Sequence, residues 1–103
     1  MEMKQLQAMI VAKRAERGFV TDPIKLCVLL TEEMGELATE IKKTWSSNYP
    51  KTTKESIAEE CSDVFCVLMA MAQAFEIDIE EAVLEKFFTK DENREWATKK
   101  QPD

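Results

Sequence analysis

The sequence predicts an all-α fold, in which a four-helix chain assembles with a second chain into a helical bundle. Only 2 glycines and 3 prolines occur among 103 residues, so few of the turn residues that a sheet protein needs are present. Hydrophobic residues make up 45% of the chain and recur at helical spacing. A single domain of this size leaves apolar surface uncovered unless subunits associate, which favours a homodimer or a higher homo-oligomer.

The first two helices are predicted by periodicity and by their end signals. Apolar residues at helical spacing predict a helix over residues 3–17, with Gly18 as the residue that ends it. Asp22 before Pro23 is typical of an N-cap followed by proline at the first helical position. The second helix is therefore expected from Pro23 to Trp45.

The third and fourth helices have start signals of a similar kind. Thr52 with Glu55 matches a capping box, which predicts a third helix that ends near Phe75. Asp78 begins a fourth helix, which is expected to continue to Trp96. One domain is expected over residues 1–103, with residues 97–103 as a frayed tail.

The segment Val64–Phe75 contains one polar residue in twelve. It is far shorter than the about 20 apolar residues that cross a bilayer, so we expect a core helix and no membrane partner. A helix that is apolar nearly all round must be enclosed on all sides. Because three other short helices are barely enough to enclose it, this segment again indicates a homo-oligomer.

Charge and composition exclude several classes of function. A net charge of −6 and a pI near 4.8 argue against a nucleic-acid polymer as partner, since such proteins need a basic surface. The N-terminal segment lacks the apolar core of a signal peptide, and we expect a cytoplasmic protein. The chain has no histidine, so Ser-His triads and mixed His/Cys zinc sites are excluded.

The cysteines are interpreted as packing residues. Their number is odd, and Cys27, Cys61 and Cys66 stand in segments that are expected to be buried. Reduced thiols fit this arrangement better than a disulfide framework. The chemistry is therefore left to carboxylates, lysines and arginines.

The second helix carries an unusual concentration of acids. Its apolar face is expected to comprise Cys27, Leu30, Met34, Leu37, Ala38, Ile41 and Trp45. Glu32, Glu33, Glu36 and Glu40 are expected on the opposite arc, where either water or a cation must compensate them. No lysine stands four residues after Glu32, Glu33 or Glu36, so like charges repel along this arc.

The third helix supplies a matching pair of acids. Glu60 and Asp63 continue the line of Val67 and Ala70, and a carboxylate at the end of a buried stripe must be protonated, paired or metal-bound. If the two helices run antiparallel, the E-E-x-x-E and E-x-x-D patterns can meet. All-oxygen sites suit Mg²⁺ or Mn²⁺. Gly35 is expected to let a neighbouring helix or a ligand approach the backbone beside these acids.

These motifs resemble those of the MazG-related, all-α nucleotide pyrophosphohydrolases. The resemblance runs over about residues 1–96, through TEEMGELATEIKKTW, AEECSDVFCVLMAMA and EKFFTKDENREW. It implies Mg²⁺-dependent hydrolysis of a nucleoside or deoxynucleoside triphosphate to the monophosphate and pyrophosphate, with Mn²⁺ as an alternative ion. Removal of unwanted nucleotides from the cellular pool is the role expected at the level of the family.

The resemblance also implies residue roles. Glu32 is either a further metal ligand or the residue that orients and deprotonates the attacking water. Phe19 is expected to stack on the base, with Trp45 and Tyr49 as alternatives, although core packing is favoured for Trp45. The expected metal ligands are Glu33, Glu36, Glu60 and Asp63, and the expected phosphate-binding residues are Lys86, Lys90, Asn93 and Arg94, with either lysine able to act.

Two other functions are open from the sequence. The chain could be a non-enzymatic, acidic helical-bundle module that binds a partner protein, with its glutamates as an ordinary solvated face. It could also be a regulator that binds divalent ions without catalysis. The interaction module leaves Gly35 and the stripe of Glu60 and Asp63 unexplained. The regulator would keep the acids but need not keep the basic segment around Arg94.

Overall fold

The computed structural model describes residues 1–96, and every regular element in that range is a helix, so the predicted all-α class is confirmed. The elements are α1 (Met3–Glu16), α2 (Pro23–Lys42), α3 (Lys54–Ala74), α4 (Ile79–Glu85) and a π-helical turn, η1 (Lys86–Lys90). The expected frayed tail, residues 97–103, lies outside the described residues. Within the described residues, no helix combines the length and the apolar character that a bilayer crossing requires.

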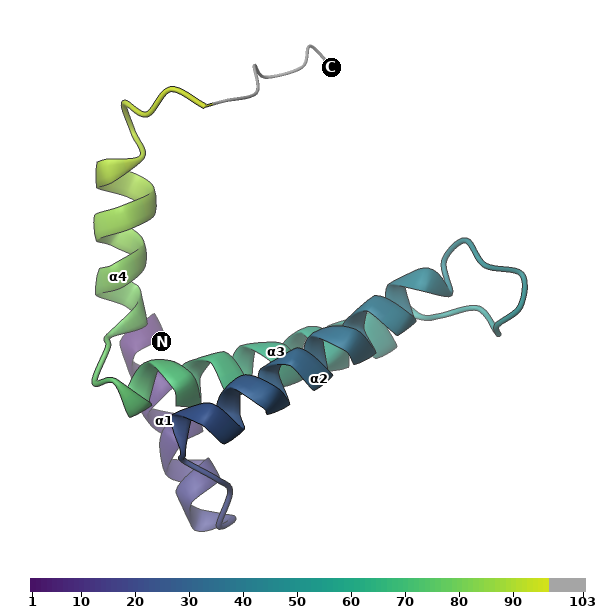
Figure 1. Ribbon diagram of the computed structural model, residues 1–103, viewed down its shortest axis with the longest axis horizontal. Helices are drawn as coiled ribbons and strands as arrows, with labels where there is room; N and C mark the ends of the chain where they lie inside the picture. Colours follow the sequence, from purple (N-terminus) through teal and green to yellow (C-terminus); the bar gives the residue numbers. More distant parts are fainter. Residues whose placement is uncertain (97–103) are drawn as a thin grey trace.

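The arrangement of the helices places the acids opposite one another. Helices α2 and α3 lie side by side as an antiparallel hairpin, joined by residues 43–53 (Figure 1). Helix α1 crosses α3 at the end away from this loop, and α4 leads off steeply from the end of α3. The antiparallel hairpin brings the middle of α2 to the middle of α3, where both acid motifs stand.

Local signals explain most of the helix ends. The side chain of Asp22 accepts a hydrogen bond from the Lys25 backbone N–H at 3.0 Å, with proline at the first helical position as predicted. Asp78 likewise accepts from the Glu81 backbone N–H at 3.2 Å. Gly18 takes a φ of 70°, a left-handed conformation that glycine adopts without steric cost.

Three predicted boundaries are wrong. The N-cap of α3 is Thr53, because the hydroxyl of the expected cap, Thr52, donates instead to the carboxylate of Glu40. Helix α2 ends at Lys42 and passes into turns that include Trp45. The helical run that begins with α4 ends at Lys90 and does not reach Trp96, since no packing offsets the cost of ordering further turns in this exposed segment.

The core is small for the length of the chain. The buried hydrophobic residues in the described range are Leu26, Val67, Met69, Ala70 and Ala72. Gln7 is the buried polar residue, and its amide donates to the Ile77 carbonyl at 2.8 Å and accepts from the Ile79 N–H at 3.0 Å. These two bonds attach α1 to the connection between α3 and α4.

Several residues that were expected in the core are exposed. Trp45 is 74% exposed, Cys27 and Cys61 are exposed, and Cys66 is half-buried. The reason is that α2 packs on α3 through a line that includes Leu26 and Leu37, which lies to one side of the predicted apolar face. The other side of that face is the α2 stripe, which we define as Cys27, Met34, Ala38, Ile41 and Trp45, all exposed in the single chain.

Candidate metal centre

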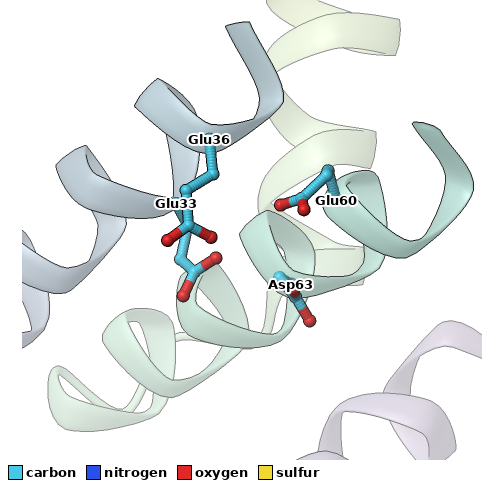
Figure 2. Close-up of side chains that lie close together, drawn as sticks. All are labelled: Glu33, Glu36, Glu60 and Asp63. Atoms are coloured by element: carbon cyan, nitrogen blue, oxygen red, sulfur yellow. The ribbon is translucent and has the colours of Figure 1, made fainter. Parts of the chain in front are cut away.

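Four carboxylates meet where α2 packs on α3. Glu33 and Glu36 come from α2, and Glu60 and Asp63 come from α3. Each offers one oxygen, and these oxygens all lie within 4.8 Å of one another. Figure 2 shows the carboxylate of Glu60 directed toward those of Glu33 and Glu36, with Asp63 one turn further along α3. The structure thus brings together the four residues that the sequence proposed as metal ligands.

The helix faces explain why Glu33 and Glu60 are half-buried while Glu36 and Asp63 are exposed. Glu33 stands between Leu30 and Leu37 in the line of α2 that packs on α3, so it takes a place that an apolar residue would normally fill. Glu60 is half-buried and stands two turns before the buried Val67 on α3. The expectation that Glu33 lies on the arc opposite the core was therefore wrong, although the pairing of the two motifs was right.

The four carboxylates lack a counter-ion among the residues that the structure describes. Within residues 1–96, none of them forms an ion pair with a lysine or an arginine. One oxygen of Glu33 and one of Glu60 are buried without any hydrogen-bond partner among the described residues. A buried polar atom without a partner is costly. These two oxygens therefore indicate that a ligand belongs between the helices.

The pKa values of the acids reflect this environment. Burial raises the pKa of Glu33, and the negative charge and hydrogen bonding of Glu36 raise it further. Burial also raises the pKa of Glu60, followed by the negative charges of Glu36 and Asp63. Both carboxyls resist ionisation at this place in the absence of a positive charge. A divalent cation would reverse that effect.

Glu40, one turn after Glu36, shows the contrasting case. Its carboxylate accepts a hydrogen bond from Thr52 and lies 2.9 Å from the ammonium of Lys43. The Thr52 hydroxyl, followed by Lys43, lowers the pKa of Glu40. This acid is satisfied by the chain itself, so the lack of partners at Glu33 and Glu60 is specific to the four-acid group.

The pH dependence of the melting temperature tests this environment, measured on protein from which a chelator has removed any metal. The pKa of Glu33 is higher in the folded state than in the unfolded state, where a glutamate has a pKa of about 4.3. Folding stability is therefore greatest below the unfolded-state pKa, and part of it is lost as the pH rises through the folded-state pKa. Replacing Glu33 by glutamine removes this loss. We expect the melting temperature of Glu33→Gln to exceed that of the unsubstituted protein by a few degrees at neutral pH, and the difference to shrink toward acidic pH.

The comparison with Glu33→Gln is necessary because Glu40, Asp78 and Asp91 have lowered pKa values and shift stability in the opposite direction. The hydrogen bond from Thr52 to Glu40 and the ion pairs of the other two are unchanged in both proteins. Glu92→Gln, which removes an exposed acid outside the hairpin, serves as the control. Parallel pH curves for Glu33→Gln and the unsubstituted protein would contradict the buried, repulsive environment.

The remaining predicted site residues are placed differently. Glu32 is exposed on α2 and is not a member of the four-acid group. Phe19 lines a cavity of about 330 Å³ that also contains Glu33 and Asp63. Trp45 and Tyr49 are not among the residues that line this cavity. Gly35 has nothing within 4 Å of the position of an added Cβ, so no helix among the described residues makes the close approach that was expected there.

The basic segment does not reach the acids within one chain. Lys86 pairs with Asp91 at 2.6 Å, Arg94 lies 3.6 Å from the same carboxylate, and Lys90 lies 3.8 Å from Glu85. Asn93 is in a turn after η1, on the arm that leads away from the hairpin (Figure 1). These phosphate-binding assignments therefore stay predictions.

Sequence reasoning missed a set of basic residues that the structure does bring to the acids. Lys13, Arg14 and Arg17 on and just after α1 line the same cavity as Glu33 and Asp63. Lys13 and Arg17 are four residues apart, which indicates that they share one face of the first helix. The prediction for this helix used its apolar stripe and assigned no role to that basic face.

The residues of the four-acid group lie in a segment that matches a known protein family. Residues 22–95 match the MazG nucleotide pyrophosphohydrolase domain, a span that holds the whole α2–α3 hairpin and the four-acid group. The chain belongs to the MazG family. As a member of the MazG nucleotide pyrophosphohydrolases it is a hydrolase, and membership argues against the non-enzymatic interaction module.

Two known proteins are similar to this chain over most of its length. The chain is 35% identical over 106 residues to the uncharacterized protein YpjD of Bacillus subtilis (strain 168), a match that covers 96% of this chain and 94% of YpjD. A solved structure is described as the Bacillus-conserved MazG protein, a nucleotide pyrophosphohydrolase. It superposes with a TM-score of 0.69 at 35% identity, over 91% of this chain and 97% of that chain. The MazG fold thus extends beyond the α2–α3 hairpin to most of the chain.

Proposed function

We propose that this MazG family member hydrolyses nucleoside or deoxynucleoside triphosphates to the monophosphate and pyrophosphate with the help of Mg²⁺, or of Mn²⁺ in its place. The observation that carries the proposal is the convergence of four carboxylate oxygens within 4.8 Å, from Glu33, Glu36, Glu60 and Asp63. None of these acids pairs with a lysine or an arginine in the described part of the chain. Removal of unwanted nucleotides is the role that fits this activity.

The donor set fits a hard divalent cation. All four candidate ligands are carboxylates, and Mg²⁺ and Mn²⁺ prefer oxygen ligands and keep positions for water and phosphate. The partnerless oxygens of Glu33 and Glu60 would gain the positive charge that they lack. When bound, such cations neutralise phosphate charge and acidify water.

The other roles in the proposal belong to residues around the four acids. Glu32 is either a further ligand or the group that orients and deprotonates the attacking water, since the chain has no histidine to act as base. Phe19 is proposed to stack on the base, because its half-exposed ring lines the cavity that adjoins Glu33 and Asp63. For Lys86, Lys90, Asn93 and Arg94 to reach a substrate at these acids, a second chain would have to bring them there.

We also propose that the chain acts as a homodimer or a higher homo-oligomer. Its radius of gyration is 16.7 Å, against about 13 Å for a compact domain of this length. The α2 stripe is exposed along the hairpin, with Ile41 at 43% and Trp45 at 74% exposure. We propose that a second copy of the chain covers this stripe, because the core of the single chain is small.

Sedimentation tests the assembly. We expect the protein to sediment at twice or more the mass of the 11.9 kDa chain. Ile41→Asp places a charge in the α2 stripe and should shift the protein to monomer, because an unpaired charge cannot be buried at an interface. Thr39→Asp, on the other side of α2, should leave the assembly intact. A monomeric unsubstituted protein would contradict the assembly.

The activity itself is tested with a panel of nucleoside triphosphates, each incubated with and without Mg²⁺. The proposal expects pyrophosphate and the monophosphate as products, and no turnover after chelation. Orthophosphate as the product, or turnover that persists in Asp63→Asn, would reject it.

A further inference from the structure

The cavity next to the four-acid group has walls of opposite charge. Its volume is about 330 Å³, at the lower end of the range of small-molecule pockets. One wall contains Glu33 and Asp63 from the hairpin, and the other contains Lys13, Arg14 and Arg17 from the end of α1. No ion pair joins the two walls within residues 1–96. The charges are therefore available to a ligand that carries both signs.

Arg14 has a structural role in this wall. Its guanidinium donates to the Val20 carbonyl at 3.2 Å and lies 5.2 Å from the centre of the Phe19 ring. These contacts hold the connector between α1 and α2 against the helix end. Arg14 therefore positions Phe19, and its guanidinium is already engaged.

Lys13 and Arg17 are less constrained. They stand four residues apart, so they lie on the same face of the α1 end. Lys13 pairs with Glu16 at 3.1 Å, but both side chains are more than half exposed and such a pair contributes little. Arg17 forms no ion pair within the described residues, and its guanidinium lies 6.0 Å from the centre of the Phe19 ring.

Cations at the end of a helix also interact favourably with the helix dipole. That effect accounts for basic residues in the last turn of α1. It does not account for their sharing a cavity with two acids of a group that lacks a counter-ion. A metal–polyphosphate complex matches both walls, since its cations face carboxylates and its remaining negative charge faces ammonium and guanidinium groups.

We propose that Lys13 and Arg17 bind the β- and γ-phosphates of the substrate, the part that leaves as pyrophosphate. This inference rests on the proposed function for the reaction, but it replaces the base-stacking role of Phe19. Arg17 lies 6.0 Å from the Phe19 ring, and the phosphates would occupy the cavity that this ring lines, so base stacking falls to the alternatives, Tyr49 or Trp45.

In the proposed reaction a water oxygen forms a bond to the α-phosphorus, and the bond from that phosphorus to the α–β bridging oxygen breaks. The water gives up one proton to its general base, the role proposed for Glu32, and the proton passes from there to solvent. The electron pair of the broken bond stays on the bridging oxygen, so negative charge develops on the leaving pyrophosphate beside Lys13 and Arg17. The two residues thereby select triphosphates over monophosphates.

The test compares pyrophosphate with monophosphate as ligands. Binding of pyrophosphate and of the nucleoside monophosphate, each with Mg²⁺, is measured by calorimetry on the full chain and on Lys13→Gln and Arg17→Gln. Each substitution is expected to weaken pyrophosphate binding about tenfold and to raise the KM for triphosphate similarly, since each removes a charged hydrogen-bond donor. Monophosphate binding should change less than about twofold, because the α-phosphate does not depend on these donors.

Two control variants complete the design. Arg17→Lys keeps the charge and should recover part of the pyrophosphate affinity, which a purely structural role would not predict. Lys25→Gln removes an exposed lysine on α2 outside the cavity and should bind pyrophosphate as the unsubstituted protein does. Melting temperatures establish that each variant is folded.

The outcomes separate this inference from the proposed function. Unchanged pyrophosphate binding in Lys13→Gln and Arg17→Gln, in a protein that hydrolyses triphosphates, overturns the inference and leaves the function standing. An equal loss of pyrophosphate and monophosphate binding also overturns it. If the unsubstituted protein hydrolyses no triphosphate, the proposed function fails, and calorimetry still decides whether Lys13 and Arg17 bind pyrophosphate.

Discussion

Replacing Glu36 by glutamine is expected to lower turnover of the triphosphate substrate by at least about 100-fold while the fold is kept. The amide removes one negative charge from the four-acid group, so the cations are held less firmly. Metal ions contribute several kcal/mol to the stabilisation of charge in a transition state, and each tenfold in rate corresponds to only about 1.4 kcal/mol. The measurement is kcat with saturating Mg²⁺, together with helical content by circular dichroism.

The stability of Glu36→Gln distinguishes a chemical effect from unfolding. The carboxylate of Glu36 raises the pKa of both Glu33 and Glu60, so its removal relieves repulsion between α2 and α3. The metal-free variant should therefore be at least as stable as the metal-free unsubstituted protein. Glu59→Gln, an exposed acid on α3, should keep full activity. Turnover in Glu36→Gln within a few-fold of the unsubstituted protein would contradict the assignment of Glu36.

Mg²⁺ is expected to raise the melting temperature of the metal-free protein strongly. A ligand that binds only the native state adds about 2.7 kcal/mol of stability at a concentration about 100 times its Kd. For a chain of about 100 residues this corresponds to a rise of roughly 10–20 °C. The physical source is the neutralisation of carboxylates that otherwise repel one another between α2 and α3. Scanning calorimetry across a Mg²⁺ titration measures the effect.

The specificity of that rise is tested with Asp63→Asn and with a monovalent salt. The asparagine variant should show a much smaller rise with Mg²⁺. The same ionic strength supplied as NaCl screens exposed charges but cannot bridge α2 and α3, so it should stabilise far less. An equal rise with NaCl and with Mg²⁺ would show that the four acids respond to general screening and hold no ion.

The sequence was sufficient for the order of the helices and for the pairing of the acids, although not for every helix boundary. N-cap chemistry is local, so the caps Asp22 (before Pro23) and Asp78 could be identified without tertiary information. Asp22 caps α2 and Asp78 caps α4, as predicted. Glu60 and Asp63 were recognisable because they continue an apolar line on one helix. An antiparallel hairpin then leaves little choice of where the two acid motifs meet.

The face of α2 could not be assigned from its own periodicity. Apolar residues cover a wide arc of this helix, and one side of that arc packs on α3 while the α2 stripe is exposed. Hydrophobicity alone does not distinguish burial within a chain from burial between chains. Core packing was favoured for Trp45 because it lies on the apolar face of its helix, but in the single chain it is exposed. Glu33 was placed on the wrong arc for the same reason.

The basic wall of the cavity depends on a contact between distant parts of the chain. Lys13 and Arg17 reach the acids only because α1 packs across α3, and Gln7 helps to fix that crossing through its bonds to Ile77 and Ile79. Nothing local to the sequence KRAER specifies which helix it will face. The basic residues near the C-terminus were assigned by resemblance alone. In the described chain they pair locally with Asp91 and Glu85, so their role at the four-acid group stays a prediction.

The central claim is that Glu33, Glu36, Glu60 and Asp63 hold a divalent cation between α2 and α3. The most direct measurement is a crystal structure of the protein grown with Mn²⁺ and a non-hydrolysable triphosphate analogue, with anomalous diffraction to locate the metal. We predict an anomalous peak bridged by carboxylates of both helices, with Glu36 and Asp63 among its ligands. Mn²⁺ bound elsewhere, with these two carboxylates in contact with water alone, would contradict the account.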